Sequence, residues 1–426
     1  MRILSVSLCY PSPAAPDEGV FVQRRLEALA QRPNVEVDVL SPRPWCPGFR
    51  RSRPIPAQDH PLSATYPPLP GVPILNWATD GWACGRAIAQ RVRQRRRSGL
   101  GDVDLIDAHF VYPEGVGALL AARRLGIPVV VTIRGKIISL ARKPVRRAQI
   151  RAMLRRVDAC IAVSDSLAQA ARDLAGEDLH VDVIPNGVDA GVFHPVDRTE
   201  ARVAIGWNPA GRYVLAVGHL QRLKGFDRLV NVWPTVRRKF GDAQLVLAGS
   251  RRGERTFQKQ LLTAIDAHNA REQAAGCAPS IAYVGAVSPQ QLNLMYNAAD
   301  LLVNSSRSEG WCNAIAEGLA AGTPIVASDV GGNRQQISSP TLGIVVPDGD
   351  PYALSEAICA ALGRSWDRDG IARLGNTRSW QSVGEQVHNV FERVVGRQAA
   401  TVRRDGAQRR IVTVPDVRPP MLEVQR

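Results

Sequence analysis

Residues 305–337 read SSRSEGWCNAIAEGLAAGTPIVASDVGGNRQQI and give the clearest indication of the fold. Its pattern predicts a strand that ends near Ser305, a short glycine-containing loop, and a helix over about 312–321. Gly322 ends that helix, and the proline two residues later opens the next strand. A strand–loop–helix–strand unit of this kind is typical of a parallel α/β sheet.

The start of this helix favours an anionic ligand. Free backbone N–H groups there point outward beside the positive end of the helix dipole, so the terminus attracts phosphate. Glu309 fits beside a phosphate if its carboxylate accepts hydrogen bonds from hydroxyl groups. Glu317 lies in the second turn of the helix, about 8 Å from the helix start at ~1.5 Å per residue. The pair could therefore hold the hydroxylated groups that flank a diphosphate, as in a nucleotide-sugar.

Two alternative roles for these glutamates stay open. Both side chains can be exposed helix charges without a role in binding. Alternatively, carboxyl groups ~6.5–9.5 Å apart form the acid–base pair of inverting glycosidases. A glycine-rich helix start suits phosphate better than a neutral glycan, so the nucleotide-sugar interpretation is preferred.

A second segment of the same half, AVGHLQRLKGFDRLV at residues 216–230, supplies positive charge. An expected strand leads into a loop with His219, Arg222 and Lys224, and a helix follows. Ligands of parallel sheets bind beyond the carboxyl ends of the strands, which is where Lys224 falls. A cation there would stabilise the charge on a leaving diphosphate, whereas the alternative for a single loop lysine is plain solvation.

The rest of the chain repeats this alternation of short strands and long amphipathic stretches. It predicts an α/β protein with two doubly wound, Rossmann-like domains. The predicted units are an N-terminal domain over 1–195, a C-terminal domain over 196–378, a closing helix over 379–397 and a basic, disordered tail over 398–426. The proline-rich residues 42–80 are expected to form a long irregular excursion from the first domain.

Charge points to an anionic partner. The 426 residues carry a net charge of +15, and 49 of the 54 basic residues are arginine. The basic runs at 91–97 and 141–156 supply much of the excess. The second run is interpreted as a solvated helix face or as a surface that rests on anionic lipid. Binding of nucleic acid ranks third among these alternatives, because the two runs lack the interleaved aromatic residues of a base-stacking surface.

Several classes of protein and site are disfavoured. No run of ~18 uncharged apolar residues occurs, so no membrane-spanning helix is expected, and the short first apolar run predicts a strand and not a secretion signal. The seven cysteines are scattered, which argues against disulfides or a zinc site and fits a reducing cytoplasm. Asp-x-Asp pairs occur at 102–104 and 348–350, but the first precedes its strand and the second places Asp350 as a helix N-cap before Pro351. No metal and no cofactor is therefore expected.

Together these segments resemble glycosyltransferase family 4, the retaining enzymes of GT-B fold. The E-x7-E pattern of that family matches EGWCNAIAE, from Glu309 to Glu317, and the following AAGTPIVASDVGG is also similar. Weaker similarity includes VIPNGVD at 183–189 and DLIDAHFVYPEG at 104–115, and the match covers about residues 1–395. The resemblance implies two Rossmann-like domains that face a cleft, with a C-terminal helix that crosses back, and sugar transfer from a nucleotide-sugar to a hydroxyl acceptor.

The resemblance also implies roles for single residues. Glu309 would contact the hydroxyls of the donor sugar, Glu317 the ribose diol, and Lys224 the diphosphate. His109, at the end of an N-terminal strand, would face the sugar. Further donor contacts would come from the close approach of Gly19 to the phosphates and from the backbone amides of Gly310, Trp311, Cys312 and Asn313. No side-chain nucleophile is implied, because the leaving phosphate oxygen can take the proton of an acceptor that enters on the same face.

This chain departs from the family's pattern at several positions. The family often has Arg where His219 stands, so Arg222 is expected to supply the second positive charge. It often has His at the position of Arg134, and Arg134 and Lys136 are assigned to the acceptor side. Cys312 stands where a second glycine is common.

The partners expected from this interpretation are a nucleotide-sugar donor and a glycan or polyprenyl-linked acceptor used in surface polysaccharide assembly. The 141–156 region would rest on the inner face of the plasma membrane, and no nucleic acid is expected. One alternative is a nucleotide-sugar 2-epimerase on the same fold. Another, from a different class, is a nucleic-acid-binding protein, which the charge of +15 would explain.

Overall fold

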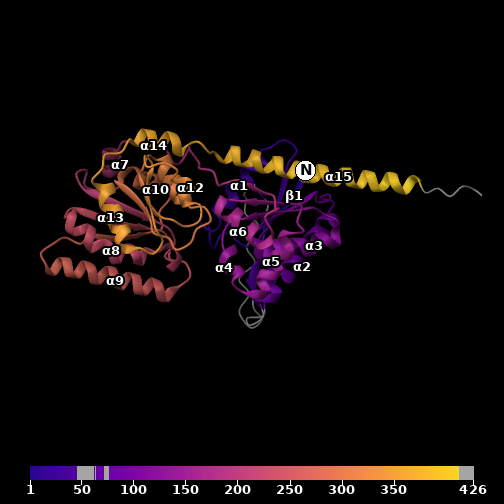
Figure 1. The fold of residues 1–426 in the computed structure, drawn as a ribbon, viewed down its shortest axis with the longest axis horizontal. Coiled ribbons are helices and arrows are strands. Elements are labelled where there is room, and N and C mark those ends of the chain that lie inside the picture. The colour runs from indigo at the N-terminus through magenta and orange to yellow at the C-terminus, as the bar shows by residue number, and fades with distance from the viewer. Residues whose placement is uncertain (46–61, 63, 72–75, 412–426) are drawn as a thin grey trace, which may run out of the picture.

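Two α/β domains lie side by side along the molecule, and one long helix joins them (Figure 1). The structure is a computed structural model that describes residues 1–45, 62, 64–71 and 76–411. Each domain has a parallel sheet with apolar clusters on both of its faces, as expected for doubly wound sheets. The prediction of a two-domain GT-B architecture is confirmed.

The N-terminal sheet has seven parallel strands in the order β4-β2-β1-β6-β7-β8-β9. Its strands are β1 (Arg2–Val6), β2 (Glu36–Leu40), β4 (Ala64–Thr65), β6 (Leu105–His109), β7 (Val129–Ile133), β8 (Ala159–Ala162) and β9 (Val181–Val183). The helices are α1 (Val20–Ala30), α2 (Asn76–Arg97), α3 (Val116–Leu125), α4 (Ile137–Ala141), α5 (Pro144–Leu154) and α6 (Asp165–Ala175).

The proline-rich excursion is more regular than expected over its described part. Here β4 extends the edge of the main sheet, and β3 (Arg43–Trp45) pairs with β5 (Pro68–Pro70) in a separate two-stranded sheet. Proline donates no backbone hydrogen bond, so such strands fit at edges and escape detection by a periodicity rule. The remainder of that segment, at 46–61, 63 and 72–75, lies outside the described residues.

The C-terminal sheet has six parallel strands in the order β12-β11-β10-β13-β14-β15. They are β10 (Arg212–Val217), β11 (Ala243–Ala248), β12 (Ile281–Gly285), β13 (Leu301–Asn304), β14 (Ile325–Ser328) and β15 (Gly343–Val346). The helices are α7 (Arg198–Ala204), α8 (Phe226–Lys239), α9 (Arg255–Ala274), α10 (Pro289–Ala298), α11 (Asn313–Ala320), α12 (Asn333–Gln336), α13 (Pro351–Leu362) and α14 (Arg368–Gly375). The strand order reverses between β10 and β13, and a ligand site is expected at such a switch point.

Helix α15 (Trp380–Ile411) leaves the C-terminal domain and runs across the N-terminal one (Figure 1). Val383, Val387 and Phe391 of this helix are buried in one apolar cluster with Leu26 and Leu29 of α1. The tail that was expected to be disordered from residue 398 is helical as far as Ile411, because its Ala, Arg and Gln residues favour helix. Residues 412–426 lie outside the described chain. Among the described helices, none combines the length and apolar composition needed to cross a bilayer.

Candidate functional site

A cavity of about 640 Å³ lies between the two domains, beyond the carboxyl ends of both sheets. The N-terminal domain contributes Gly19, which follows β1, and Arg134 and Lys136, which follow β7. The C-terminal domain contributes most of the other predicted site residues, which are His219, Lys224, Glu309, Gly310, Trp311, Cys312, Asn313 and Glu317. The structure therefore brings segments that are far apart in the sequence together around one space.

Lys224 and Glu309 form an ion pair in this cavity. The Lys224 Nζ donates to Glu309 Oε1 at 2.7 Å, and the side chains are 22% and 8% exposed. The Ser306 hydroxyl donates to the same carboxylate oxygen at 2.7 Å. Burial alone would lower the pKa of Lys224, but the Glu309 carboxylate raises it, so the lysine keeps its charge.

The strand order explains why these two residues meet. The Lys224 loop follows β10 and the Glu309 loop follows β13, and these strands are neighbours in the sheet. Gly225 has a φ of +68°, and a Cβ there would collide with the carbonyl oxygen of Ser305. Only glycine lets the two loops touch at this point, which holds the ammonium next to the carboxylate.

Glu317 lies on α11 and faces the same cavity. Its Oε2 accepts a hydrogen bond from the Tyr296 hydroxyl at 2.9 Å. Burial raises the pKa of Glu317 to about 7, and the bond from Tyr296 acts in the opposite direction. The carboxyl group therefore changes charge near neutral pH.

Cys312 and Asn313 lie at the start of α11. Cys312 is 3% exposed, and burial raises the pKa of its thiol to about 12, so no thiolate is available at neutral pH. Asn313 Oδ1 accepts a hydrogen bond from Asn186 Nδ2 of the N-terminal domain at 2.9 Å. This bond ties the helix start to the opposite side of the cavity.

Two predicted contact residues do not line the cavity. His109 was expected to face the sugar, but it is fully buried, and its Nδ1 accepts a hydrogen bond from Arg134 Nε at 3.0 Å. Arg134 thus separates His109 from the space between the domains. Arg222 lies over the ring of Phe257, 5.0 Å from its centroid, and also falls outside the cavity lining. The geometry does not support Arg222 as the second cation.

Arg252 is a cation of this lining on the C-terminal side, and it was not among the predicted site residues. It follows the carboxyl end of β11 and pairs with Asp17 of the N-terminal domain, while a second contact joins Arg252 Nη1 to Glu18 Oε2 at 3.7 Å. The rule that found Lys224, a basic side chain just beyond a strand, would also have found Arg252. The Ser250 hydroxyl donates to Asp17 Oδ2 at 2.9 Å, and its Oγ lies 2.7 Å from Nδ1 of His219.

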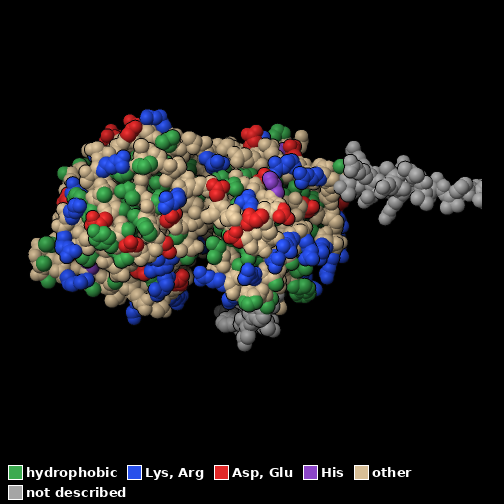
Figure 2. Space-filling model, in the orientation of Figure 1, with side chains coloured by type: hydrophobic (Ala, Val, Ile, Leu, Met, Phe, Trp, Pro, Cys, Tyr) green, Lys and Arg blue, Asp and Glu red, His purple; other side chains and the backbone are tan. Residues whose placement is uncertain are grey.

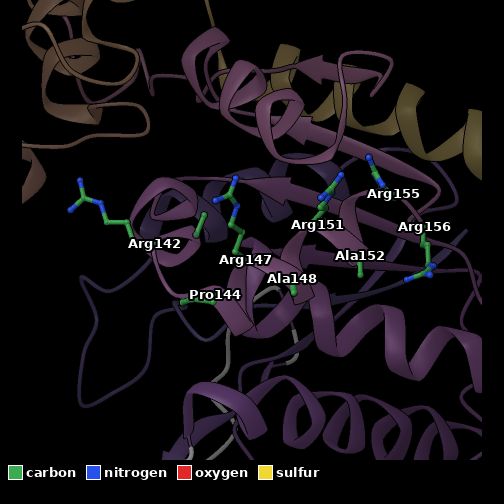
Figure 3. A pocket seen from close by; sticks show the side chains of 9 residues that line it. Arg142, Pro144, Arg147, Ala148, Arg151, Ala152, Arg155 and Arg156 are labelled. Carbon is green, nitrogen blue, oxygen red and sulfur yellow. The ribbon is translucent and has the colours of Figure 1, made fainter.

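A separate basic groove lies on the N-terminal domain. Arg147 and Arg151 project from one exposed face of α5 with Ala148 and Ala152 beside them, and Arg155 directly follows the helix (Figure 3). The groove that they line measures about 660 Å³. The opposite face of α5 is buried through Ile150, Met153 and Leu154. Figure 2 shows basic side chains gathered over this part of the domain, where α2, α3 and α5 lie.

The two Asp-x-Asp pairs serve local structure. Asp102 pairs with Arg96 Nε at 2.6 Å, and Asp104 accepts from the Arg2 backbone N–H at 2.6 Å. Asp350 caps α13 by accepting from the backbone N–H of Ala353, as its place before Pro351 predicted. No cluster of three or more His, Cys, Asp or Glu suited to a metal occurs among the described residues.

Known protein families match both halves of the chain. Residues 19–192 match the family described as Glycosyltransferase Family 4, and residues 211–364 match Glycosyl transferases group 1. A D-inositol 3-phosphate glycosyltransferase from Jonesia denitrificans is 30% identical over 323 residues, which cover 71% of this chain and 74% of that protein. TuaC of Bacillus subtilis, a putative teichuronic acid biosynthesis glycosyltransferase, is 27% identical over 84% of this chain and 88% of its own length.

The matched length differs between relatives. A D-inositol 3-phosphate glycosyltransferase from Segniliparus rotundus is 29% identical, and the match spans 66% of this chain but only 64% of that protein. Among solved structures, sucrose-phosphate synthase from Thermosynechococcus elongatus has a TM-score of 0.67 at 21% identity, covering 96% of this chain and all of that one. HepE of Anabaena, solved in complex with UDP-glucose, has a TM-score of 0.64 at 18% identity, covering 94% of this chain and all of that one. At these identities the structural matches show a shared fold.

Proposed function

This chain belongs to glycosyltransferase family 4, and from that premise we propose that it transfers a sugar from a nucleotide-sugar to a hydroxyl group of a glycan acceptor, with retention of configuration. The observation that carries the proposal is the contact of 2.7 Å between Lys224 and Glu309 beside the start of α11. A cation, a helix start and a carboxylate that can accept from hydroxyls then lie in one cavity between two domains. That combination matches a donor with a diphosphate and a sugar.

In the proposed complex the diphosphate binds between Lys224 and the backbone N–H groups at the start of α11. Glu309 accepts hydrogen bonds from the sugar hydroxyls, and Glu317 accepts them from the ribose. Arg252, near Asp17, supplies the second positive charge in place of Arg222. HepE of Anabaena, which shares this fold, was solved with UDP-glucose.

The proposed reaction needs no protein nucleophile. The bond between the anomeric carbon and the diphosphate oxygen breaks, and its electron pair goes to the leaving oxygen. The acceptor oxygen bonds to the anomeric carbon on the same face, and its proton goes to the leaving diphosphate. Lys224 and the helix start stabilise the developing negative charge, and we assign no metal or cofactor to this step.

The test uses purified protein with a panel of UDP-, GDP- and ADP-sugars. We expect one donor to raise the melting temperature and to be hydrolysed slowly without acceptor. Lys224→Ala and Glu309→Ala should each lower the rate by ~10² or more, the scale of losing one preorganised charge contact. Lys259→Ala, an exposed lysine on α9, is the matched control and should leave the rate unchanged.

Three results would contradict the proposal. One is a panel in which no donor stabilises the protein. Another is release of a free 2-epimer without acceptor, which would identify an epimerase. The third is salt-sensitive binding of random duplex DNA that survives both active-site substitutions, which would favour the nucleic-acid alternative.

We further propose that the acceptor is lipid-linked and that the arginine face of α5 rests on an anionic membrane at the inner side of the plasma membrane. Arg147 and Arg151 are exposed there, and two large apolar side chains beside the groove, Ile138 and Val145, are 59% and 42% exposed. Exposed apolar groups next to cations suit a membrane interface.

Vesicle flotation tests this surface. Binding to phosphatidylglycerol vesicles should exceed binding to phosphatidylcholine vesicles. The double variant Arg147→Gln/Arg151→Gln should bind about 30-fold more weakly, at ~1 kcal/mol for each basic side chain. Arg238→Gln/Arg255→Gln, on exposed sites of the C-terminal domain, is the control. If the protein binds both kinds of vesicle equally, the proposed membrane surface is wrong. The same holds if both double variants bind phosphatidylglycerol vesicles equally.

A further inference from the structure

Arg134 is a buried cation with one unused donor at the cavity between the domains. Its side chain is 7% exposed, and the residue lines the cavity directly after β7. Nε donates to His109 Nδ1 at 3.0 Å, and Nη1 donates to Asn186 Oδ1 at 2.9 Å. Nη2 has no hydrogen-bond partner among the described residues. A buried guanidinium donor without an acceptor is costly, so a ligand that supplies the acceptor would gain affinity.

The buried charged residues next to Arg134 carry more positive than negative charge. Arg25 is 2% exposed and uses its guanidinium on Asp107, with 2.8 Å from Nη2 to Oδ1. His109 is neutral at pH 7, because burial lowers its pKa to about 4. The cluster thus contains two guanidinium cations, Arg25 and Arg134, and a single carboxylate, Asp107.

Two further acidic groups of the N-terminal domain, Glu114 and Cys9, add little negative charge at pH 7. Glu114 accepts from the Leu8 backbone N–H at 2.9 Å, and burial raises its pKa to about 8, so it is mainly neutral at pH 7. Cys9 also lines the cavity, and burial raises the pKa of its thiol to about 11. Lys136, which also lines the cavity, adds a further positive charge.

The position of Arg134 places this charge beside the proposed sugar site. Through Asn186 its guanidinium is connected to Asn313, the first residue of α11. Its backbone carbonyl lies against Gly310, where a Cβ would collide with it. The Phe21 ring lies on one face of the guanidinium, 5.1 Å from Cζ, and limits the directions from which a ligand can approach.

We propose that Arg134, supported by Lys136, selects a substrate that carries an anionic group next to the reacting sugar. This inference rests on the proposed function and specifies its substrate class. The shared chemistry is a carboxylate or phosphate oxygen that accepts from Nη2, and it can reside on the transferred sugar, as in a uronic acid, or on the acceptor. Arg134 is then a specificity residue that contacts substrate, and His109 and Asn186 hold it in position.

The experiment compares matched neutral and anionic ligands. In the donor arm, calorimetry measures UDP-glucose against UDP-glucuronate and UDP-galactose against UDP-galacturonate. In the acceptor arm, saturation-transfer NMR in the presence of UDP measures glucose against glucuronate and against glucose 6-phosphate. We expect the anionic member to bind at least tenfold more tightly in one arm, and the arm that responds identifies the source of the charge.

Variants show whether the preference comes from Arg134. Arg134→Gln should remove the preference between neutral and anionic ligands, whereas Arg134→Lys should keep part of it. Arg123→Gln, an exposed arginine on α3, is the control. Melting curves of each variant report folding. If Arg134→Gln does not fold, the wild-type comparison together with Arg134→Lys still decides the question.

Failure of this inference differs from failure of the proposed function. If UDP binds and Lys224→Ala abolishes that binding, but neutral and anionic ligands bind alike in both arms, the role of Arg134 is wrong and the donor site stands. If Arg134→Gln retains the preference, the role is also wrong. If no nucleotide binds at all, both conclusions fall.

Discussion

Burial of Glu317 makes the proposed ribose contact sensitive to pH. The carboxyl group has one hydrogen-bond donor, Tyr296, and burial raises its pKa to about 7. In the neutral form it keeps one hydroxyl proton and accepts poorly from a diol, whereas the carboxylate accepts from two hydroxyls. Binding of a ribose diol therefore favours the ionised form and requires loss of that proton at low pH.

Donor affinity should increase as pH rises through neutrality. Between pH 6 and pH 8 the ionised fraction of a group with a pKa near 7 rises about tenfold, so the Kd of a nucleotide-sugar should fall by about the same factor. Calorimetry at pH 6, 7 and 8 measures this change. Glu317→Gln should bind weakly with a flat pH profile, while Glu385→Gln, exposed on α15, should behave as wild type. A flat wild-type profile would show that Glu317 does not contact the donor.

Single residues of the site could be predicted from the sequence only in part. Glu309 and Lys224 were found because each follows a strand, and the carboxyl ends of neighbouring parallel strands lie together. The directions of side chains are not encoded in such spacing. His109 ends β6 as expected, but Arg134 covers it, and Arg222 turns onto Phe257. Both differences arise from tertiary contacts that no local pattern reports.

Among the elements, the strands of the two main sheets were largely predictable. Buried parallel strands are short apolar runs, such as VVVTI at β7, and they stand out between amphipathic helices. Strands β3 and β5 were missed because proline interrupts their pattern and their partners are remote. The closing helix was predicted to end at 397, but α15 continues through Gly396 to Ile411, because a single glycine inside a helical pattern does not by itself end a helix.

Phe391 tests the contribution of α15 to the N-terminal domain. Its ring is fully buried against α1, so Phe391→Ala should lower the free energy of unfolding by about 3–5 kcal/mol. Urea denaturation followed by circular dichroism measures the change. Asn389→Ala, on the exposed face of the same helix, should change stability little. If both variants unfold at the same urea concentration, α15 does not support that core.

At the scale of the whole molecule, the two domains approach closely at a glycine. Gly310 of the C-terminal domain lies against the carbonyl oxygen of Arg134, and Trp311 packs on the N-terminal core. Asp165 N donates to Gln335 Oε1 across the same boundary at 3.1 Å. This arrangement encloses the cavity, so the distance between the domains depends on the absence of a side chain at residue 310.

A methyl group at that position should hold the domains apart. Gly310→Ala is expected to increase the radius of gyration measured by small-angle X-ray scattering and to lower sugar transfer by ~10², because misplaced reacting groups lose that much. Gly241→Ala is a suitable control, since a Cβ there meets no atom within 4 Å. Unchanged scattering and unchanged rate in Gly310→Ala would mean that this close approach is not needed for turnover.

The crossing of α15 has a consequence for biosynthesis. On the ribosome, α1 emerges early, while the residues that cover its apolar stripe are added only when Val383 to Phe391 are translated. At ~5–20 residues per second, roughly 20–70 seconds separate the two events. During that interval the side of this apolar cluster that α15 covers in the finished protein stays open to solvent.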